Sequence, residues 1–312
     1  MLSTARRSNQ DKDIYFLGDD TNRKLVSAGV RFFPLQAFRR GDLLADFQKV
    51  FVPLAGRAHH YNKTGGVGTW LRFVFERWFI IREFLHEQRI SSFWIFDSDT
   101  LVAGDLTVRE TRFAGFDATE QCGGCCLNGY VSSRNVVDGY CRKMVELHRR
   151  PDYLGAQKRR LEEHPGLAFN EMDAWQTHRD EAGLKTMVLG IPRDGEAFDD
   201  ALAITGGWQT ATTKVRGRIP VKRLVCDDHG GFFAFPTGNS DPIRLVTLNL
   251  SWLPEYVFHR LAPWCRPTGP RKYETRNCSE VDFSEPFTEH LLRRIREKAW
   301  LLRSGFFRQS NT

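Results

Sequence analysis

Asp97 and Asp99 stand one residue apart at the end of an apolar run that covers residues 93–96. Two carboxylates at this spacing raise each other's pKa unless a cation neutralises them. Magnesium and manganese ions prefer carboxylate oxygens and usually share them with the phosphates of a substrate. The pair therefore predicts a divalent-cation site for a diphosphate, in which the metal acts as a Lewis acid on the leaving phosphate. The plainer interpretation is a polar exit from a strand.

The sequence around the pair predicts how it is positioned. The apolar run predicts a fully buried strand in parallel pairing, and the carboxyl end of such a strand opens into the crevice where α/β sheets bind ligands. Directly before it, apolar residues at helical spacing predict a long helix over residues 69–88. Further upstream, strands are expected at residues 13–17 and 30–35, joined by a turn and a short helix at residues 23–28. This order is typical of a nucleotide-binding half-sheet.

The remaining elements complete an α/β fold with a Rossmann-like mixed sheet flanked by helices. Further strands are expected at residues 49–54, 113–116, 127–132 and 186–191, and helices at residues 136–149 and 171–178. A smaller β-rich region is expected from short strands at residues 222–226, 232–235 and 244–250, followed by a basic amphipathic helix at residues 285–303. We therefore expect a disordered N-terminus (residues 1–12), one main domain (residues 13–255) and a C-terminal helical extension packed on it (residues 256–312).

Composition limits the partners and the compartment. The chain has 312 residues, and its 45 Lys and Arg against 38 Asp and Glu give a net charge of +7, which suits an anionic ligand or a membrane surface. No basic tract is interleaved with aromatic residues, so no nucleic-acid partner is expected. Neither an apolar signal segment nor a spanning stretch is visible, which predicts a cytoplasmic protein. For the basic helix at residues 285–303, a solvated face and a peripheral membrane contact stay open as alternatives.

The cysteines predict reduced thiols, because seven of them occur without a secretory signal. Four form a loose cluster in the sequence: Cys122, Cys125, Cys126 and Cys141. A zinc site is one interpretation of that cluster. The strand-like run around Cys125 and Cys126 favours the other, which is packing inside the fold.

With these elements in place, their order resembles that of the GT-A glycosyltransferases, which transfer a sugar from a nucleotide-diphosphate donor. Residues 93–101, Phe-Trp-Ile-Phe-Asp-Ser-Asp-Thr-Leu, look like the D-x-D strand exit of that class. Residues 15–22, Tyr-Phe-Leu-Gly-Asp-Asp-Thr-Asn, look like its first strand and nucleotide-contacting turn. The resemblance implies a transferase that depends on Mn²⁺ or Mg²⁺. Its expected donor is a nucleotide-diphospho-sugar, first of all a UDP-sugar, and its expected acceptor is a hydroxyl of a glycan or a polysaccharide precursor.

The resemblance also implies roles for single residues. Asp99 would bind the metal directly, and Asp97 would contact the donor ribose and the metal. Asn249 stands where the class often supplies a third metal ligand, frequently His, and His259 is the alternative. The other implied donor contacts are Gly18 and Asp19 near the base, Arg72 near the diphosphate, and Asn128 and Gly129 near the donor sugar. For Arg72 a surface salt bridge, and for residues 128–129 an ordinary strand, are the plainer interpretations.

Two acidic residues at the start of a predicted helix look like the acceptor-side carboxylate of the class. If transfer inverts the anomeric centre, Glu171 or Asp173 would deprotonate the acceptor hydroxyl as a general base. If transfer retains it, the same residues would orient donor and acceptor. The plainer interpretation is that acidic residues favour a helix N-terminus because of the helix dipole, with Asn170 as the N-cap.

Two rival functions stay open. A HAD-type phosphohydrolase also has D-x-D after an apolar strand, with Lys222 and the pair Asp227 and Asp228 as later motifs, although Leu101 departs from its first motif. The stretch at residues 227–231 is better explained as a hairpin turn. The second rival is a catalytically inactive GT-A-like module that binds carbohydrate or protein, which the departure at Asn249 suggests.

Overall fold

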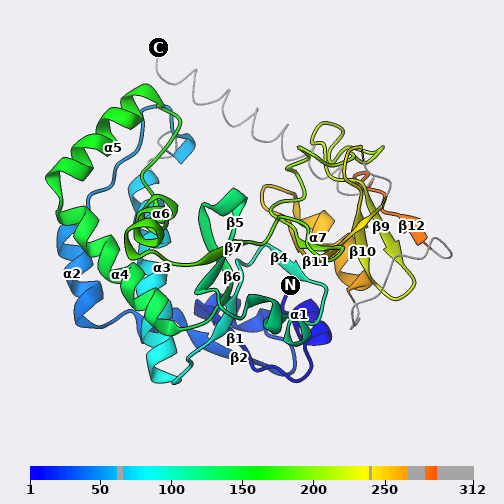
Figure 1. Cartoon of the computed structure of the whole chain (residues 1–312), viewed down its shortest axis with the longest axis horizontal. Coiled ribbons are helices and arrows are strands. Elements are labelled where there is room, and N and C mark those ends of the chain that lie inside the picture. Colours follow the sequence, from blue (N-terminus) through cyan, green and yellow to red (C-terminus); the bar gives the residue numbers. More distant parts are fainter. Residues whose placement is uncertain (62–65, 239–240, 266–277, 287–312) are drawn as a thin grey trace, which may run out of the picture.

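The computed structural model describes residues 1–61, 66–238, 241–265 and 278–286, and it has a mixed α/β architecture (Figure 1). Within these residues the named strands form three sheets. The smallest pairs β1 (Ile14–Gly18) with β2 (Val30–Pro34) in parallel. The second has the order β3 (Phe93–Ile95), β6 (Cys126–Val131), β5 (Ala118–Gln121) and β7 (Thr186–Val188). The third has the order β12 (Cys278–Glu280), β9 (Leu224–Asp227), β10 (Phe232–Ala234), β11 (Ile243–Asn249) and β4 (Thr100–Val102), with β8 (Glu196–Phe198) also paired to β11.

The helices divide the molecule into a helical side and a strand-rich side. The α-helices are α1 (Leu2–Ser8), α2 (Asp42–Val50), α3 (Val67–Glu87), α4 (Arg134–Arg149), α5 (Pro151–Glu163), α6 (Glu171–Ala182) and α7 (Glu255–Leu261). Short 3-10 helices include η1 (Asp20–Leu25) and η4 (Thr107–Phe113). Figure 1 shows α2 to α6 gathered on one side of the four-stranded sheet, with the six-stranded sheet and α7 on the other. No described helix is both long and apolar enough to cross a membrane.

The strand before Asp97 differs from the prediction in its pairing and burial. β3 is three residues long, is only half-buried, and pairs antiparallel with β6 at the edge of its sheet, where a buried parallel strand was expected. Both faces of β3 still contact apolar clusters: Phe93 and Ile95 pack toward the helical side, and Trp94 and Phe96 pack toward η4 and β8. A continuous apolar run therefore arises here from two-sided packing, without parallel neighbours.

Several other predicted elements are confirmed. The strands expected at residues 13–17 and 30–35 are β1 and β2, and the long helix is α3. The predicted helix at residues 136–149 is α4, and the helix at residues 171–178 is α6 with Asn170 as its N-cap. The later predictions correspond to β6, β7, β9, β10 and β11.

Two local predictions are wrong, and one helix was not predicted. Residues 49–54 begin as the end of α2 and then leave it without forming a strand, because Leu44 and Phe47 bury one face of a helix there. Residues 113–116 follow η4, and the strand starts only at β5. Residues 151–163 form α5, which the charged sequence hid, although Pro151 at its first position is a usual helix start.

The two ends of the described chain also differ from the prediction. Residues 1–12 contain α1 and are not disordered: Ser8 Oγ donates to the Val102 carbonyl (3.1 Å), and Asn9 Oδ1 accepts from the Leu106 backbone N–H (2.7 Å). The C-terminal extension is not purely helical, since β12 adds a strand beside β9 and Phe283 is fully buried. The basic helix predicted at residues 285–303 lies almost entirely outside the described residues.

Candidate functional site

The Asp97–Asp99 segment connects two sheets. The chain leaves the four-stranded sheet at Ile95, turns with a hydrogen bond from the Thr100 N–H to the Asp97 carbonyl (3.0 Å), and enters the six-stranded sheet as β4. There Thr100 pairs with Asn249 of β11. Asp97 and Asp99 lie in this turn, outside the strand. Their side chains therefore need not point to alternate faces of the sheet.

Arg77 of α3 joins Asp97 to Glu171. Its Nη1 donates to Asp97 Oδ1 (2.8 Å) and its Nη2 donates to Glu171 Oε1 (3.1 Å). Burial works against the charge of Arg77, but the carboxylates of Asp97 and Glu171 outweigh it and raise the pKa of the guanidinium. Arg77 therefore stays charged and links the motif to the first residue of α6.

Glu171 is the buried acid of the site. Its side chain is 9% exposed, and burial raises the pKa of the carboxyl to about 6, with Arg77 opposing the shift. A carboxyl with a pKa near 6 is mostly ionised at neutral pH but close enough to it to exchange protons.

Asp99 is held from the strand-rich side. Its Oδ2 accepts a hydrogen bond from Ser251 Oγ (2.5 Å), and its carbonyl accepts one from the Leu250 N–H (2.8 Å). Burial raises the pKa of the Asp99 carboxyl, and the neighbouring charge of Asp97 adds to the rise. Ser251 could not be singled out from the sequence, because its contact depends on β11 lying beside β4.

Several buried polar atoms of these side chains have no hydrogen-bond partner among the described residues. They are Asp99 Oδ1, Arg77 Nε, Glu171 Oε2 and Asn128 Oδ1. Native proteins pair nearly all buried polar atoms, so a local group of unpaired ones points to a missing ligand, water or ion. Arg77 contacts both Asp97 and Glu171, and Asp99 lies two residues after Asp97 in the same turn.

The described residues contain no group of three or more His, Cys, Asp or Glu that could hold a metal ion. The two aspartates fit a different kind of site, since Mg²⁺ is often bound by one or two carboxylates together with water and substrate phosphates. The buried, unpaired Oδ1 of Asp99 is the atom that such a cation would satisfy. Residues Asp97 and Asp99 thus fit the predicted cation only if the substrate completes its ligand shell.

Asn249 lies next to the site but is engaged in holding its wall. Its Oδ1 accepts from the Ser251 N–H (2.9 Å), and its own N–H donates to Asp199 Oδ2 (3.1 Å). Asn249 therefore positions the loop that carries Ser251. His259 is on the exposed side of α7, where its Nε2 lies 3.3 Å from Glu255 Oε1.

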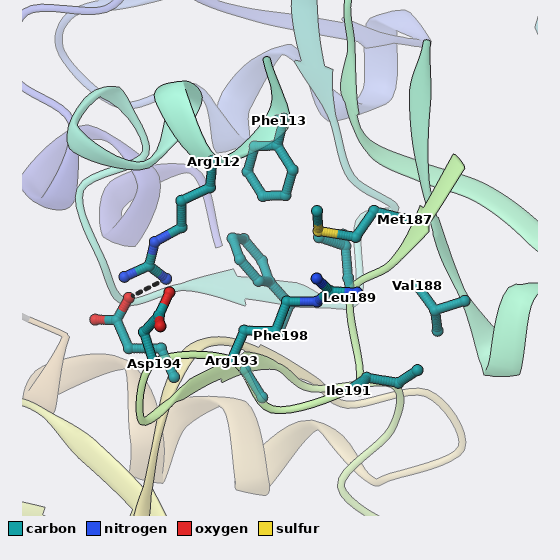
Figure 2. Close-up of a pocket in the computed structure, with 11 residues that line it drawn as sticks. Arg112, Phe113, Met187, Val188, Leu189, Ile191, Arg193, Asp194 and Phe198 are labelled. Carbon is teal, nitrogen blue, oxygen red and sulfur yellow. Dashed lines mark ion pairs between the residues drawn. The ribbon is translucent and has the colours of Figure 1, made fainter. Parts of the chain in front are cut away.

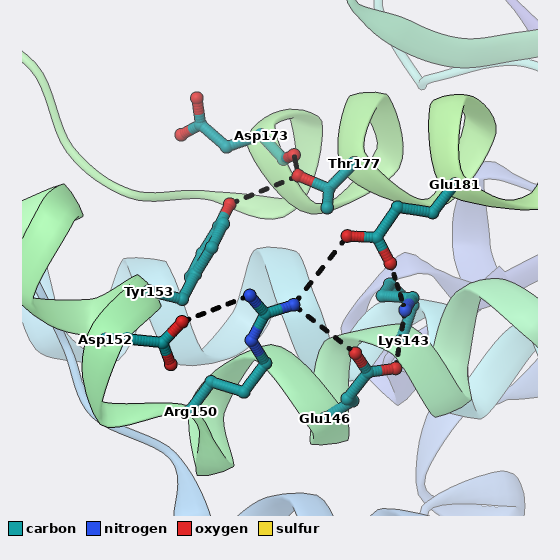
Figure 3. Close-up of polar contacts among 8 residues, drawn as sticks. All are labelled: Lys143, Glu146, Arg150, Asp152, Tyr153, Asp173, Thr177 and Glu181. Atoms are coloured by element: carbon teal, nitrogen blue, oxygen red, sulfur yellow. Dashed lines mark hydrogen bonds and ion pairs between the residues drawn. The ribbon is translucent and has the colours of Figure 1, made fainter.

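Asp173 has a structural role that separates it from Glu171. Its carboxylate binds Arg160 (2.6 Å) and accepts from the Asn170 N–H (3.2 Å), which completes a capping box at the start of α6. Figure 3 shows the neighbouring contact of Tyr153 with Thr177, whose Oγ1 donates to the Asp173 carbonyl (3.0 Å).

A network of ion pairs fixes α6 against α4. Lys143 binds Glu146 (2.5 Å) and Glu181 (2.6 Å), and Arg150 lies within 4 Å of the same two carboxylates (Figure 3). Since Glu171 is the first residue of α6, this network contributes to the fixed position of Glu171 opposite Arg77.

The other predicted donor contacts lie in different surroundings. Gly18 ends β1, and the exposed Asp19 caps η1 by accepting from the Thr21 N–H (2.8 Å). Arg72 lies over the Phe51 ring, with its guanidinium carbon 5.4 Å from the centroid. On α3 it is Arg77, five residues later, that contacts the aspartate pair; the helical spacing of α3 was visible in the sequence, but the partner of Arg77 was not.

Asn128 and Gly129 lie on β6 beside the end of β3. Gly129 pairs with Ile95, and its φ of 90° suits glycine. A Cβ there would meet Leu189 and Thr119 at 2.4 Å, so packing already requires the glycine. Asn128 is the residue before Gly129 and lies one position beyond the Ile95–Gly129 pair. Its Oδ1 is one of the buried oxygens without a partner among the described residues.

A strained turn adds one more acid that the sequence analysis missed. The backbone N–H groups of Cys122 and Gly123 donate to the Asp200 carboxylate (3.0 and 3.3 Å), and Cys122 has a φ of 54°. Burial raises the pKa of Cys122 to about 11, and the charges of Asp200, Asp97 and Asp99 contribute. The turn therefore holds the Asp200 carboxylate through two backbone N–H groups. The seven cysteines are free thiols, and Cys141 is fully buried in the helical core.

No family model matches the chain, and comparisons with curated proteins and with solved structures return no match. The function must therefore be argued from this geometry.

Proposed function

We propose that this protein is a metal-dependent glycosyltransferase of GT-A type, which transfers a sugar from a nucleotide-diphosphate donor to a hydroxyl acceptor. The observation that carries the proposal is the cluster of Asp97, Asp99, Arg77 and Glu171, in which buried polar atoms of the last three have no partner among the described residues. A UDP-sugar is the first donor to test, and a glycan or polysaccharide precursor is the expected acceptor class.

In this proposal Asp97 and Asp99 would hold Mn²⁺ or Mg²⁺ together with the donor diphosphate. The cation, when bound, supplies Lewis-acid stabilisation of the leaving nucleoside diphosphate. Ser251 orients Asp99 through its hydroxyl, 2.5 Å from Oδ2. Arg77 offers a fixed positive charge beside the same pair, and a guanidinium suits phosphate oxygens.

Glu171 is the residue of this chain that we assign to the acceptor hydroxyl. Its Oε2, which has no hydrogen-bond partner among the described residues, and its pKa of about 6 support a role in taking up a proton if transfer inverts the anomeric centre. If transfer retains it, Glu171 would orient the two substrates. Asp173 is not part of the assignment, because Arg160 and the helix cap occupy its carboxylate.

A non-catalytic binding module is the second candidate. One observation favours it: among the described residues, no third His, Cys, Asp or Glu joins the aspartate pair to form a metal-binding group. The phosphohydrolase alternative has less support. Asp227 accepts hydrogen bonds from two N–H groups of the hairpin turn, and Lys222 forms a buried ion pair with Asp199 (2.5 Å). Both residues therefore have structural partners.

A panel of UDP-, GDP-, CMP- and ADP-sugars, each with and without Mn²⁺, tests the proposal through thermal stabilisation and release of nucleotide. We expect one donor to stabilise the chain only with Mn²⁺ and to be hydrolysed slowly without acceptor. Asp99→Asn should abolish both effects, whereas Asp152→Asn on the exposed side of α5 should keep them. Stabilisation without turnover would favour the binding module, and no response to any donor would refute the transferase.

A further inference from the structure

A separate cavity of about 180 Å³ lies between the end of η4 and the segment that connects β7 to β8 (Figure 2). Its apolar lining includes Phe113, Met187, Leu189 and Phe198, all of them buried. Phe198 in turn stacks on Trp94, with ring centroids 5.7 Å apart and planes 15° apart. The cavity therefore has a rigid aromatic and aliphatic wall on the Trp94 face of β3.

Two cations and two acids line the cavity, and further cations lie behind Glu196. Glu196 is already bound by the fully buried Arg109 through two nitrogens (2.9 and 2.5 Å), and Arg112 adds a third contact at 2.8 Å. Figure 2 shows Arg112 and Asp194 at this wall of the cavity. Arg244 lies 3.8 Å from the Glu196 carboxylate, so three guanidiniums surround Glu196, while Arg193 and Asp194 add one charge of each sign.

Arg193 is the cation without a partner. Its side chain is exposed, lines the cavity, and makes no hydrogen bond or ion pair with the residues that the structure describes. The backbone holds it in place, because Arg193 and Glu196 exchange two hydrogen bonds (2.8 and 2.9 Å) across a two-residue turn. Asp194 and Gly195 occupy this turn with φ of 51° and 74°, as a tight I′-type hairpin requires.

We propose that this cavity binds a small organic anion that has a short apolar body and one carboxylate. The apolar wall would take the body, and Arg193 with Arg112 would take the carboxylate, for which a planar guanidinium is the matching group. The volume is below the roughly 300–1,000 Å³ of sites for drug-sized ligands, so the occupant must be short. Because the turn is already formed, little ordering is required of Arg193's backbone on binding.

The test is isothermal titration of the full chain with hexanoate, and with hexanol as the uncharged match. We expect saturable one-site binding of hexanoate in the millimolar range or tighter. Hexanol should bind at least about tenfold more weakly, as loss of a charge-assisted contact predicts.

Variants at the proposed anion contact locate the site. Arg193→Gln should weaken hexanoate binding about tenfold, Arg193→Lys should retain part of it, and Arg159→Gln on exposed α5 should leave it unchanged. Thermal unfolding of each variant confirms that the fold is intact. The proposal is overturned by an absence of saturable binding, by equal binding of hexanoate and hexanol, or by a folded Arg193→Gln variant that binds like the parent.

Discussion

Two sets of acids in the molecule differ in their cationic partners. One set is Glu196 of β8 with Asp199 just after it, and the other surrounds the end of β3. Glu196 and Asp199 each face a buried cation of their own, Arg109 and Lys222, both at 2.5 Å. At the end of β3, one guanidinium contacts two carboxylates, and among the described residues the Asp99 side chain is held by the hydroxyl of Ser251. The two sets are neighbours, because Asn249 contacts Asp199 and pairs with Thr100.

This difference in charge compensation indicates a structural role for the first set and a ligand-binding role for the second. Arg109 and its neighbours outweigh the effect of burial on Glu196 and lower the pKa of that carboxyl, so the charge is compensated within the fold. Burial raises the pKa of Asp199 even beside Lys222, as it raises the pKa of Asp99 and Glu171. The two sets therefore differ in their partners: Asp199 has a buried cation at 2.5 Å, whereas Asp99 has no ion pair with the described residues. Buried acids with few cationic or hydrogen-bond partners destabilise a fold. Such groups are expected where a bound ligand supplies the missing partners.

Removing a cation from the compensated set should have the largest effect on stability. Lys222→Met removes the cation that pairs with Asp199, in a site where both side chains are at most 3% exposed. We expect the free energy of unfolding in urea at pH 7 to fall by about 3–5 kcal/mol. Asp97→Asn, at a half-exposed residue, should change it by less than about 1 kcal/mol. Equal losses would remove the distinction between the two sets.

Neutralising an acid of the uncompensated set should affect function and spare the fold. Asp99→Asn removes a predicted cation ligand, and we expect nucleotide-sugar turnover with Mn²⁺ to fall at least about 100-fold. Stability should be unchanged or higher, because an amide avoids the burial of a charge. Turnover and urea unfolding are measured on the same preparation, with Asp152→Asn as the control. Unaltered turnover in the Asp99 variant would take this residue out of the site.

The raised pKa of Glu171 predicts a dependence on pH with a definite sign. A folded pKa of about 6 against an ordinary value of 4.5 means that the folded state holds the proton more tightly. Stability therefore falls as pH rises from about 4.5 to about 6, by about 2 kcal/mol from this group. Comparing urea unfolding of the parent and of Glu171→Gln at pH 4 and pH 7 isolates the difference.

The same pair of proteins tests the chemistry of Glu171. If it acts as a base, turnover of the parent rises as pH passes about 6 and then levels off, because the ionised carboxylate is the active form. Glu171→Gln should lose this rise together with most of the activity. A rise that persists in the variant assigns it to another group.

Asp173 allows the comparison to be made between two acids of the same helix. It lies two residues from Glu171, and its carboxylate is bound by Arg160 and the Asn170 N–H. Asp173→Asn weakens the Arg160 contact and the capping box, which should lower the free energy of unfolding by about 1 kcal/mol. Turnover should stay unchanged, since this carboxylate is not assigned to the acceptor. A large loss of turnover with an intact fold would reverse the roles of the two acids.

Local sequence determined the elements whose signals lie within a few residues. The helical spacing of apolar residues predicted α3 and α4, and Asn170 followed by acids predicted the start of α6. The polar stretch at residues 227–231 predicted the turn between β9 and β10. Predictions failed where a short apolar run is compatible with more than one structure, as at residues 49–54.

The sequence by itself thus determined the α/β class and the aspartate pair at the end of an apolar strand. Only the tertiary structure decided which acids and cations meet there. Arg77, Glu171 and Ser251 are far apart in the chain, and helical spacing cannot distinguish Arg77 from Arg72. Burial and neighbouring charge set the difference between Glu171 and Asp173, and both properties arise only when α6 packs beside α3 and α4.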